Sequence, residues 1–280
     1  MDIIRYNAPR KLLAVARGHP YARDAFCGLL AGLEEFDACL VEQPAAQALL
    51  QPSAAGEFDA IVCYDMPGVD FTADDAPAPL APPEDVRRDY LAMLEAGVGM
   101  VFMHHALAAW PGWPEYAEIV GGRFHYRPAE LRGETWPDSG YRHAVTHRLS
   151  AAGSHPVTQG LPAQFEMTDE LYLCAVFEED VTPLLRSDYG FTQDNFYSAA
   201  HAVAGRMHSR AGWSHPPGSN LVGWAKHHRN SPIVYLQGGD DAAAMDNEYF
   251  RQLLHNAVRW VSSAAAHDWA RAANRRGNGR

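Results

Sequence analysis

Short apolar runs and helical patterns alternate along most of the chain. Each apolar run is bounded by turn or polar residues, and its length suits a strand that is buried in a parallel sheet. We predict strands at residues 12–16, 60–64, 99–103 and 233–236, and a shorter one at 38–41.

Amphipathic helices are predicted between these runs. Apolar residues recur at helical spacing over residues 26–33, 86–94 and 249–261. Gly97 supplies a stop for the second helix, and Asp246 or Asn247 caps the third. Strands that alternate with helices form right-handed βαβ units. We therefore predict an α/β protein with a doubly wound, mostly parallel sheet and helices on both faces.

The middle of the chain, residues 123–188, has a different pattern. Residues 142–149 and 171–176 are rich in strand-forming side chains and flank the turn-rich stretch 153–162. We interpret this region as a β-rich insertion within the same domain. Residues 72–83 and 201–228 are expected to be long connections, which in such folds usually shape a site.

The domain prediction is a single domain over residues 1–262, followed by a C-terminal tail over 263–280. The tail mixes arginine with alanine, asparagine and glycine, and we expect a frayed, solvated end. Its basic residues are Arg271, Arg275, Arg276 and Arg280.

Net charge and hydropathy exclude several classes of partner. The formal net charge of −11 would repel a nucleic-acid backbone, so nucleic acid is not an expected partner. The start of the chain lacks an apolar signal core, and no apolar run reaches the roughly 18 residues of a membrane span. We therefore expect no membrane association and a cytoplasmic location.

The four cysteines are scattered and indicate neither a disulfide framework nor a zinc knuckle. They are Cys27, Cys39, Cys63 and Cys174. Cys27 and Cys63 lie within apolar patterns and are interpreted as small core residues.

Histidines, acidic residues and glycines follow the predicted strands. Ligands of open α/β sheets bind outside the carboxyl ends of the strands, so these residues are expected to line one crevice. They are His19, Asp65, His104, His105, Gly238, Gly239 and Asp240.

Each of these residues also has a structural interpretation. A histidine at a strand end is commonly a hydrogen-bonded structural group. Gly238 and Gly239 could form a tight turn or let backbone N–H groups approach an anion. Asp240 could cap a following turn. Trp110 could stack on a sugar ring or pack over the edge of the domain.

Several sequence blocks together resemble the ThuA family associated with trehalose utilisation. The blocks are Val-Phe-Met-His-His-Ala-Leu from Val101, Trp113-Pro-Glu-Tyr, Gly121-Gly-Arg-Phe-His, His155-Pro-Val-Thr-Gln-Gly-Leu, Asp169-Glu-Leu-Tyr and Asn256-Ala-Val-Arg-Trp. The resemblance covers residues 11–261. It implies a flavodoxin-like sheet similar to that of class I glutamine amidotransferases, and a role in the metabolism of disaccharides or keto-sugars.

Two departures from these relatives bear on the chemistry. The turn that presents a nucleophilic cysteine in class I amidotransferases here presents His104 and His105, so glutaminase activity is not expected. The family's last strand commonly ends in Gly-His followed by an acidic residue, whereas this chain has Gly238, Gly239 and Asp240.

Three hypotheses of function follow, each with a small-molecule carbohydrate as partner. In the first, a sugar-modifying hydrolase or isomerase uses His104, Asp169 and Glu170 as acid and base. Asp169 and Glu170 could instead form a helix start or a salt bridge. The residues expected to bind the ligand are His19, Asp65, His105, Trp110, Arg123 and Asp240.

In the second hypothesis, His19, His104, His105 and a carboxylate hold a divalent metal such as zinc or manganese, although no compact ligand motif is present. In the third, the chain is a non-catalytic sugar-sensing or partner-binding module. A homodimer is also expected, through a face formed by exposed aromatic residues. These aromatic residues are Trp110, Trp113, Tyr116 and Trp136.

Overall fold

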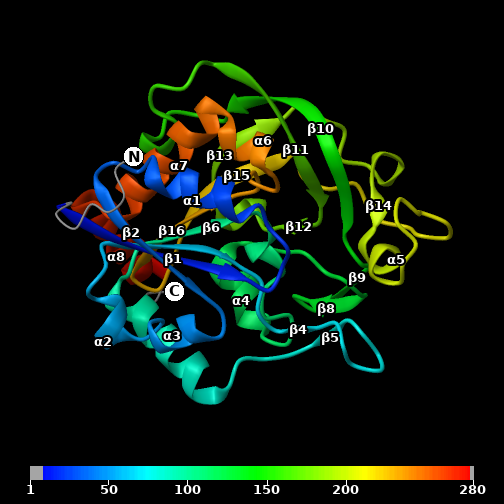
Figure 1. Cartoon of the computed structure of the whole chain (residues 1–280), viewed down its shortest axis with the longest axis horizontal. Coiled ribbons are helices and arrows are strands. Elements are labelled where there is room, and N and C mark those ends of the chain that lie inside the picture. Colours follow the sequence, from blue (N-terminus) through cyan, green and yellow to red (C-terminus); the bar gives the residue numbers. More distant parts are fainter. Residues whose placement is uncertain (1–8, 278–280) are drawn as a thin grey trace.

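The computed structural model describes residues 9–277 and is built around one large sheet (Figure 1). The strands of the large sheet are β1 (Arg10–Arg17), β2 (Phe36–Glu42), β3 (Ala60–Asp65), β6 (Met100–Met103), β10 (Gly140–Ala151), β11 (Gln164–Leu173), β13 (Thr182–Ser187), β14 (Tyr197–Ser198), β15 (Leu221–His228) and β16 (Ser231–Leu236). Their order is β11-β10-β13-β15-β16-β6-β3-β1-β2, with β14 paired to β10.

Shorter elements complete the chain. Three small two-stranded sheets pair β4 (Val69–Asp70) with β5 (Ala78–Pro79), β7 (Gly122–Arg123) with β12 (Ala175–Val176), and β8 (Ala129–Leu131) with β9 (Glu134–Trp136). The helices are α1 (Arg23–Ala31), α2 (Pro52–Ala55), α3 (Glu84–Ala96), α4 (Pro114–Val120), α5 (Ala199–Val203), α6 (Ala242–Asp246), α7 (Glu248–Val261) and α8 (Ala264–Gly277). Short 3-10 turns include η2 (His104–Ala108) and η3 (Pro156–Thr158).

The parallel half of the sheet confirms the predicted fold class. β1 pairs in parallel with β2 and β3, β3 with β6, and β6 with β16. Numbered along the chain, these five strands have the order 2-1-3-4-5 that defines a flavodoxin-like sheet. The continuous apolar runs are buried on both faces, as expected for parallel strands, and residues 12–16 are fully buried.

Helices cover the two faces with separate apolar cores. α1 and α7 pack on one face through side chains such as Phe26 and Leu253. α3 and α4 pack on the other through Met93 and Ile119 (Figure 1). Gly97 ends α3 in a left-handed conformation, as predicted. The side chain of Asn247 caps α7, which resolves the alternative between Asp246 and Asn247.

The β-rich middle of the chain extends the same sheet with antiparallel strands. β15 pairs with β16, β13 with β15, β10 with β13, and β11 with β10, each in antiparallel orientation. The predicted insertion is therefore part of the main sheet. The expectation of one long connection over 201–228 was wrong for its second part, because residues 221–228 form the buried strand β15.

The C-terminal segment differs from the expected frayed tail. Residues 264–277 form α8, which packs on β15, β16 and α7, and Ala266 and Ala270 are fully buried. Alanines at helical spacing allow this close packing, although they contribute little to a hydrophobicity pattern. Residues 1–8 and 278–280, including Arg280 of the predicted tail, lie outside the described residues.

Candidate functional site

The strand β6 ends in a strained turn that presents His104. The backbone φ of His104 is +47°, a left-handed conformation that costs free energy for a residue with a side chain. The Tyr235 hydroxyl donates to the His104 carbonyl at 3.0 Å and holds the turn. The sequence predicted such a turn, but the His104 side chain is fully buried, not exposed to the crevice.

Both ring nitrogens of His104 have polar neighbours. Nδ1 lies 2.7 Å from the carbonyl oxygen of Gln237, which can only accept, so Nδ1 carries a hydrogen. Nε2 lies 3.1 Å from Glu170 Oε2 and 3.3 Å from Asp240 Oδ1. The Tyr172 hydroxyl is 2.6 Å from the same Nε2, and its ring stacks on the imidazole. The ends of the predicted strands at 99–103 and 233–236 therefore do meet, around this imidazole.

Asp169 and Glu170 lie in the middle of β11, not at the start of a helix. Successive side chains of a strand point to opposite faces, so the two carboxylates diverge. Glu170 and Tyr172 reach His104. Asp169 instead accepts the backbone N–H groups of Gly239 at 2.7 Å and Asp240 at 3.1 Å. Asp169 therefore does not reach His104 and instead holds the loop after β16.

A β-bulge in β10 turns a second histidine toward the cluster. The pairing of β10 with β11 shifts between Arg142 and Val145, so that one extra residue faces Glu170. His143 lies in this bulge, with Nδ1 3.3 Å from Glu170 Oε1 and 3.6 Å from Asp240 Oδ2. Its side chain is 43% exposed, so it is the imidazole of the cluster that a ligand can reach.

A pocket of about 170 Å³ opens directly above this cluster. It lies between the first residues of β10 and α5, at one edge of the molecule (Figure 1). Its polar lining includes His19, His143 and Glu170. Its apolar and aromatic lining is formed by Phe124, Tyr126, Tyr141, Tyr172, Ala199, Ala202 and Met207.

His19 and His105 form a stack beside the pocket. Their ring centroids are 4.6 Å apart, and His105 also packs on Tyr64. His105 Nε2 donates to the carbonyl of Tyr64 at 2.9 Å, and the ring is fully buried. His19 lines the pocket as expected of a ligand-binding residue, whereas His105 lies behind it and supports it.

The cluster shifts the pKa values of its members. Burial alone would lower the pKa of His104, but hydrogen bonds to Asp240 and Glu170 outweigh burial and raise that pKa well above its ordinary value. For Asp240, burial opposes ionisation, yet the bonds to His104 and His143 lower the pKa of its carboxyl overall. Burial lowers the pKa of both His19 and His105, which favours their neutral forms. Burial also raises the pKa of Asp169 to about 7.

Of the six expected ligand-binding residues, His19 is the one that lines the pocket. His105 lies behind the pocket and Asp240 contacts the cluster beneath it, whereas the other three lie elsewhere. Arg123 is buried, and its guanidinium donates to the carbonyls of Ala109 and Trp110 at 2.5 and 2.6 Å. Trp110 is itself buried and packs on the Gly68 turn. Asp65 is buried and accepts a hydrogen bond from Gln43 Nε2 at 2.7 Å. These residues support the backbone around the strand ends and do not line the pocket.

The aromatic residues that motivated a homodimer are not exposed. Trp110, Trp113 and Tyr116 are buried in the core, and Trp136 packs partly buried against a smaller apolar cluster. The physical basis of that expectation is therefore removed.

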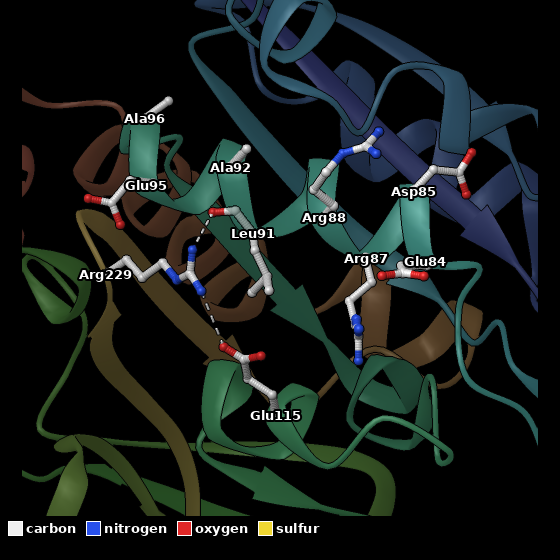
Figure 2. Close-up of a pocket in the computed structure, with 10 residues that line it drawn as sticks. All are labelled: Glu84, Asp85, Arg87, Arg88, Leu91, Ala92, Glu95, Ala96, Glu115 and Arg229. Carbon is white, nitrogen blue, oxygen red and sulfur yellow. Dashed lines mark hydrogen bonds and ion pairs between the residues drawn. The ribbon is translucent and has the colours of Figure 1, made fainter.

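A larger hollow of about 1110 Å³ lies elsewhere, along α3 (Figure 2). Arg229, in the turn before β16, donates to the Leu91 carbonyl at 3.2 Å and pairs with Glu115 at 3.6 Å there. This turn lies at the amino end of β16, whereas the cluster lies beyond the carboxyl end of the same strand. None of the predicted site residues lines this hollow.

Histidine, cysteine, aspartate and glutamate side chains can bind a metal ion. Within residues 9–277, one group of three or more of them has potential ligand atoms that all lie within 4.8 Å of one another, and its members are His104, Glu170 and Asp240. The expected metal set of His19, His104 and His105 is therefore not the one that the structure brings together. His105 donates a hydrogen bond from Nε2 to the Tyr64 carbonyl, and His19 donates one from Nδ1 to the Pro20 carbonyl at 2.8 Å. These nitrogens are therefore occupied by backbone partners.

The sequence interpretation missed His143 and Tyr172. A signal for Tyr172 existed, because alternation along a strand places it on the same face as Glu170. His143 had no such signal, since regular alternation contains no information about a bulge.

Fold and site together define a flavodoxin-like α/β protein with an imidazole–carboxylate cluster at the carboxyl ends of its strands. The chain belongs to the ThuA family, described as trehalose utilisation, whose model matches residues 25–261. No curated protein gives a significant match.

Solved structures with the same fold include two putative ThuA-like proteins. The one from Parabacteroides merdae has a TM-score of 0.62 and 17% identity, over 91% of this chain and 90% of that chain. The one from Bacteroides uniformis has a TM-score of 0.62 and 18% identity, over 93% of this chain and 95% of that chain. A cytoplasmic protein of Salmonella typhimurium aligns at a TM-score of 0.54 and 11% identity, over 90% and 100%. In the part of this chain that the structure describes, no helix has the length and apolar character needed to span a membrane.

Proposed function

We propose that this protein is a cytoplasmic enzyme of carbohydrate metabolism, a hydrolase or isomerase that binds a disaccharide or keto-sugar and moves a proton with His143. One observation carries this proposal. A partly exposed imidazole faces the pocket while its Nδ1 lies against two carboxylates, Glu170 and Asp240. The family's association with trehalose utilisation supports the class of ligand.

The pocket suits a small polar ligand with apolar faces. Its volume of about 170 Å³ is below the roughly 300–1,000 Å³ of pockets that take drug-sized ligands, and it fits a single sugar unit. Aromatic rings such as Tyr126 and Tyr141 offer faces for the C–H side of a sugar ring. His19, His143 and Glu170 offer hydrogen bonds to its hydroxyl groups.

The arrangement of His143 matches what a general base needs. When Nδ1 donates to a carboxylate, the proton stays on Nδ1 and Nε2 keeps a lone pair that can accept a proton from the ligand. Glu170 and Asp240 hold the ring in this orientation. In isomerisation the base takes a proton from a hydroxyl group or from the carbon beside a carbonyl, and in hydrolysis it takes one from the attacking water. The protonated His143 can then return this proton to the carbon or oxygen that receives it or to the leaving oxygen.

Glutaminase chemistry is not part of the proposal. That reaction needs a thiolate at the turn after the central strand, and His104 stands there. Of the cysteines, Cys63 and Cys174 are buried and Cys27 and Cys39 lie on other elements.

A binding module without catalysis is the second candidate. It is favoured by the complete burial of His104 and by Gly239, which stands where the family commonly has histidine. In this version the same pocket recognises a sugar, and His143 acts only as a hydrogen-bonding group.

Calorimetry followed by product analysis separates the two candidates. Trehalose, other glucose disaccharides and their keto forms are titrated into the protein, and each binder is then incubated and analysed for products. The enzyme predicts turnover that His143→Gln lowers by about 10²–10⁴-fold. His255→Gln is the matched control, because His255 also lies 3.6 Å from a carboxylate, Glu35, but far from the pocket. Binding without product favours the module, and no binding by any of these sugars overturns the proposal.

A further inference from the structure

We propose that His104, Glu170 and Asp240 form a binding site for one divalent transition-metal ion, of the zinc or manganese class, at the floor of the pocket. The inference rests on the proposed function in one respect, since it takes the same pocket as the working site. Metal binding itself can be measured without any sugar.

The distances within the cluster suit one shared ion. His104 Nε2 lies 3.1 Å from Glu170 Oε2 and 3.3 Å from Asp240 Oδ1. Nitrogen and oxygen ligands bind zinc at about 2.0–2.2 Å in tetrahedral geometry, which places ligand atoms about 3.3–3.6 Å apart. The two distances from His104 Nε2 are within a few tenths of an ångström of this spacing, and all three ligand atoms lie within 4.8 Å of one another.

The imidazole of His104 is held as metal-binding histidines are held. Its Nδ1–H donates to the Gln237 carbonyl at 2.7 Å, so Nε2, which faces the carboxylates, is the nitrogen that would release its proton to solvent and bind an ion. The Gln237 side chain is in turn fixed, because its Oε1 accepts the Tyr172 backbone N–H at 3.0 Å. The Asp240 backbone N–H is held by Asp169 at 3.1 Å. Two of the three ligands thus have outer partners that orient them.

The charge of the cluster also favours a cation. Glu170 and Asp240 are two carboxylates of low exposure that converge on a single buried imidazole. Buried carboxylates are costly unless a positive charge compensates them. His143 contacts both carboxylates from the pocket side but is partly exposed, so the buried Nε2 of His104 still faces two carboxylate oxygens. A divalent ion would balance both.

Three protein ligands leave the remaining coordination positions open, as in catalytic rather than structural sites. His143 contacts the other oxygen of each carboxylate, Oε1 of Glu170 and Oδ2 of Asp240, so it does not compete for the ligand atoms. The Tyr172 hydroxyl, 2.6 Å from His104 Nε2, would lie beside the ion. An open position on the pocket side could bind a hydroxyl or carbonyl oxygen of a sugar and polarise it, while His143 remains free to move the proton.

Competition dialysis of tag-free, full-length protein tests this site. The protein is stripped with a chelator and equilibrated with limiting Zn²⁺ or Mn²⁺ in the presence of a weak competing chelator, because fourteen histidines give adventitious weak binding. Retained ions are counted by mass spectrometry. We expect one ion per chain in the wild type, and Glu170→Gln and Asp240→Asn to weaken binding at least about tenfold.

Two matched controls keep the test specific. Glu115→Gln changes a glutamate that lies 3.6 Å from both His228 and Arg229, and Asp246→Asn changes an exposed aspartate that pairs with Arg251. Both should retain the ion as the wild type does. Circular dichroism checks the fold of each variant, and Asp240→Asn, at a side chain that is 21% exposed, keeps the test valid if Glu170→Gln does not fold.

Two results would overturn the metal site: a wild type that retains no more ion than Asp240→Asn, or site variants that retain as much as the controls. Metal-free protein that transforms a sugar at the full rate would also remove the metal from the mechanism while leaving the proposed function intact. Conversely, one ion per chain without binding of any sugar would support the metal site and count against the proposed function.

Discussion

Asp169 and Glu170 are neighbours in β11, yet their carboxylates lie on opposite faces of the strand. Glu170 contacts His104 and His143, whereas Asp169 accepts the backbone N–H groups of Gly239 and Asp240. One carboxylate thus belongs to the cluster, and the other fixes the loop that delivers Asp240 to it.

Asp169→Ala should destabilise the protein by about 2–4 kcal/mol, because it leaves buried backbone N–H groups without acceptors. Glu170→Gln should change the free energy of unfolding less, because the amide preserves shape and one acceptor oxygen. Urea unfolding of both variants measures the difference. The control is Asp268→Ala, whose exposed carboxylate pairs with Arg271 and whose loss should cost less than about 0.5 kcal/mol. Equal losses for Asp169→Ala and the control would contradict the positioning role.

The parallel half of the fold could be predicted because its signals are local. The run at residues 12–16 is apolar throughout since both of its faces are covered, and the stripe over 249–261 is a complete helical face. The rule that ligands bind at the carboxyl ends of strands then placed His104 and Asp240 at the same edge, and the structure confirms that they meet.

The remaining features depend on contacts between distant segments. His143 joins the cluster through a bulge that exists only because β10 pairs with β11. Arg123 is a buried structural residue because the carbonyls of Ala109 and Trp110 face it, and nothing in its own neighbourhood of the sequence indicates that. α8 was missed because alanines that bury a helix against a sheet have little hydrophobic contrast.

Gly239→Ala should destabilise the protein more than an alanine at an open turn. Gly239 has a φ of +108°, and an added Cβ would lie 3.1 Å from Met103 Cε and 3.3 Å from Phe250 Cζ. The conformational strain and the crowding together should cost about 1–3 kcal/mol. Gly133→Ala is the matched control, since Gly133 has a φ of +79° and no atom lies within 4 Å of an added Cβ. Its loss of stability therefore measures the cost of backbone strain without crowding.

Thermal and urea unfolding compare these two glycine variants. If Gly239→Ala lowers the free energy of unfolding by no more than Gly133→Ala does, the side chains of Met103 and Phe250 can move aside at little cost. In that case the loop after β16 could accept the histidine that the family commonly has there.

Asp65 should make the protein less stable as the pH rises through about 6. Burial raises the pKa of Asp65 from its ordinary value of 3.8 to about 6, although the hydrogen bond from Gln43 opposes this shift. The folded state therefore prefers the protonated carboxyl. This preference contributes fully below pH 3.8 and is lost as the pH rises past 6, with a total change on the order of 3 kcal/mol.

Asp65→Asn removes this titration, because the amide stays neutral and its oxygen can still accept from Gln43. We expect the stability of Asp65→Asn relative to the wild type to increase between pH 4 and pH 8, as measured by urea unfolding at both values. Asp246→Asn, the same substitution at an exposed aspartate, is measured alongside as the control. A constant difference between wild type and Asp65→Asn would mean that Asp65 does not change its charge in this range.

Arg123→Lys should destabilise the protein without changing ligand affinity. The guanidinium donates from two nitrogens to two carbonyls, of Ala109 and Trp110, and a lysine ammonium cannot reproduce this planar fork. Burial also lowers the pKa of Arg123 to about 10, and a lysine in the same place would bear a larger cost of desolvation. We expect the free energy of unfolding, measured with urea, to fall by about 1–3 kcal/mol.

Arg127→Lys is the control, because Arg127 pairs with Asp75 at the surface and its replacement should lower the free energy of unfolding by less than about 0.5 kcal/mol. If Arg123→Lys instead left stability unchanged and weakened the binding of a sugar, Arg123 would be the ligand-binding residue that the sequence suggested, and the pocket would extend beneath the turn after β6.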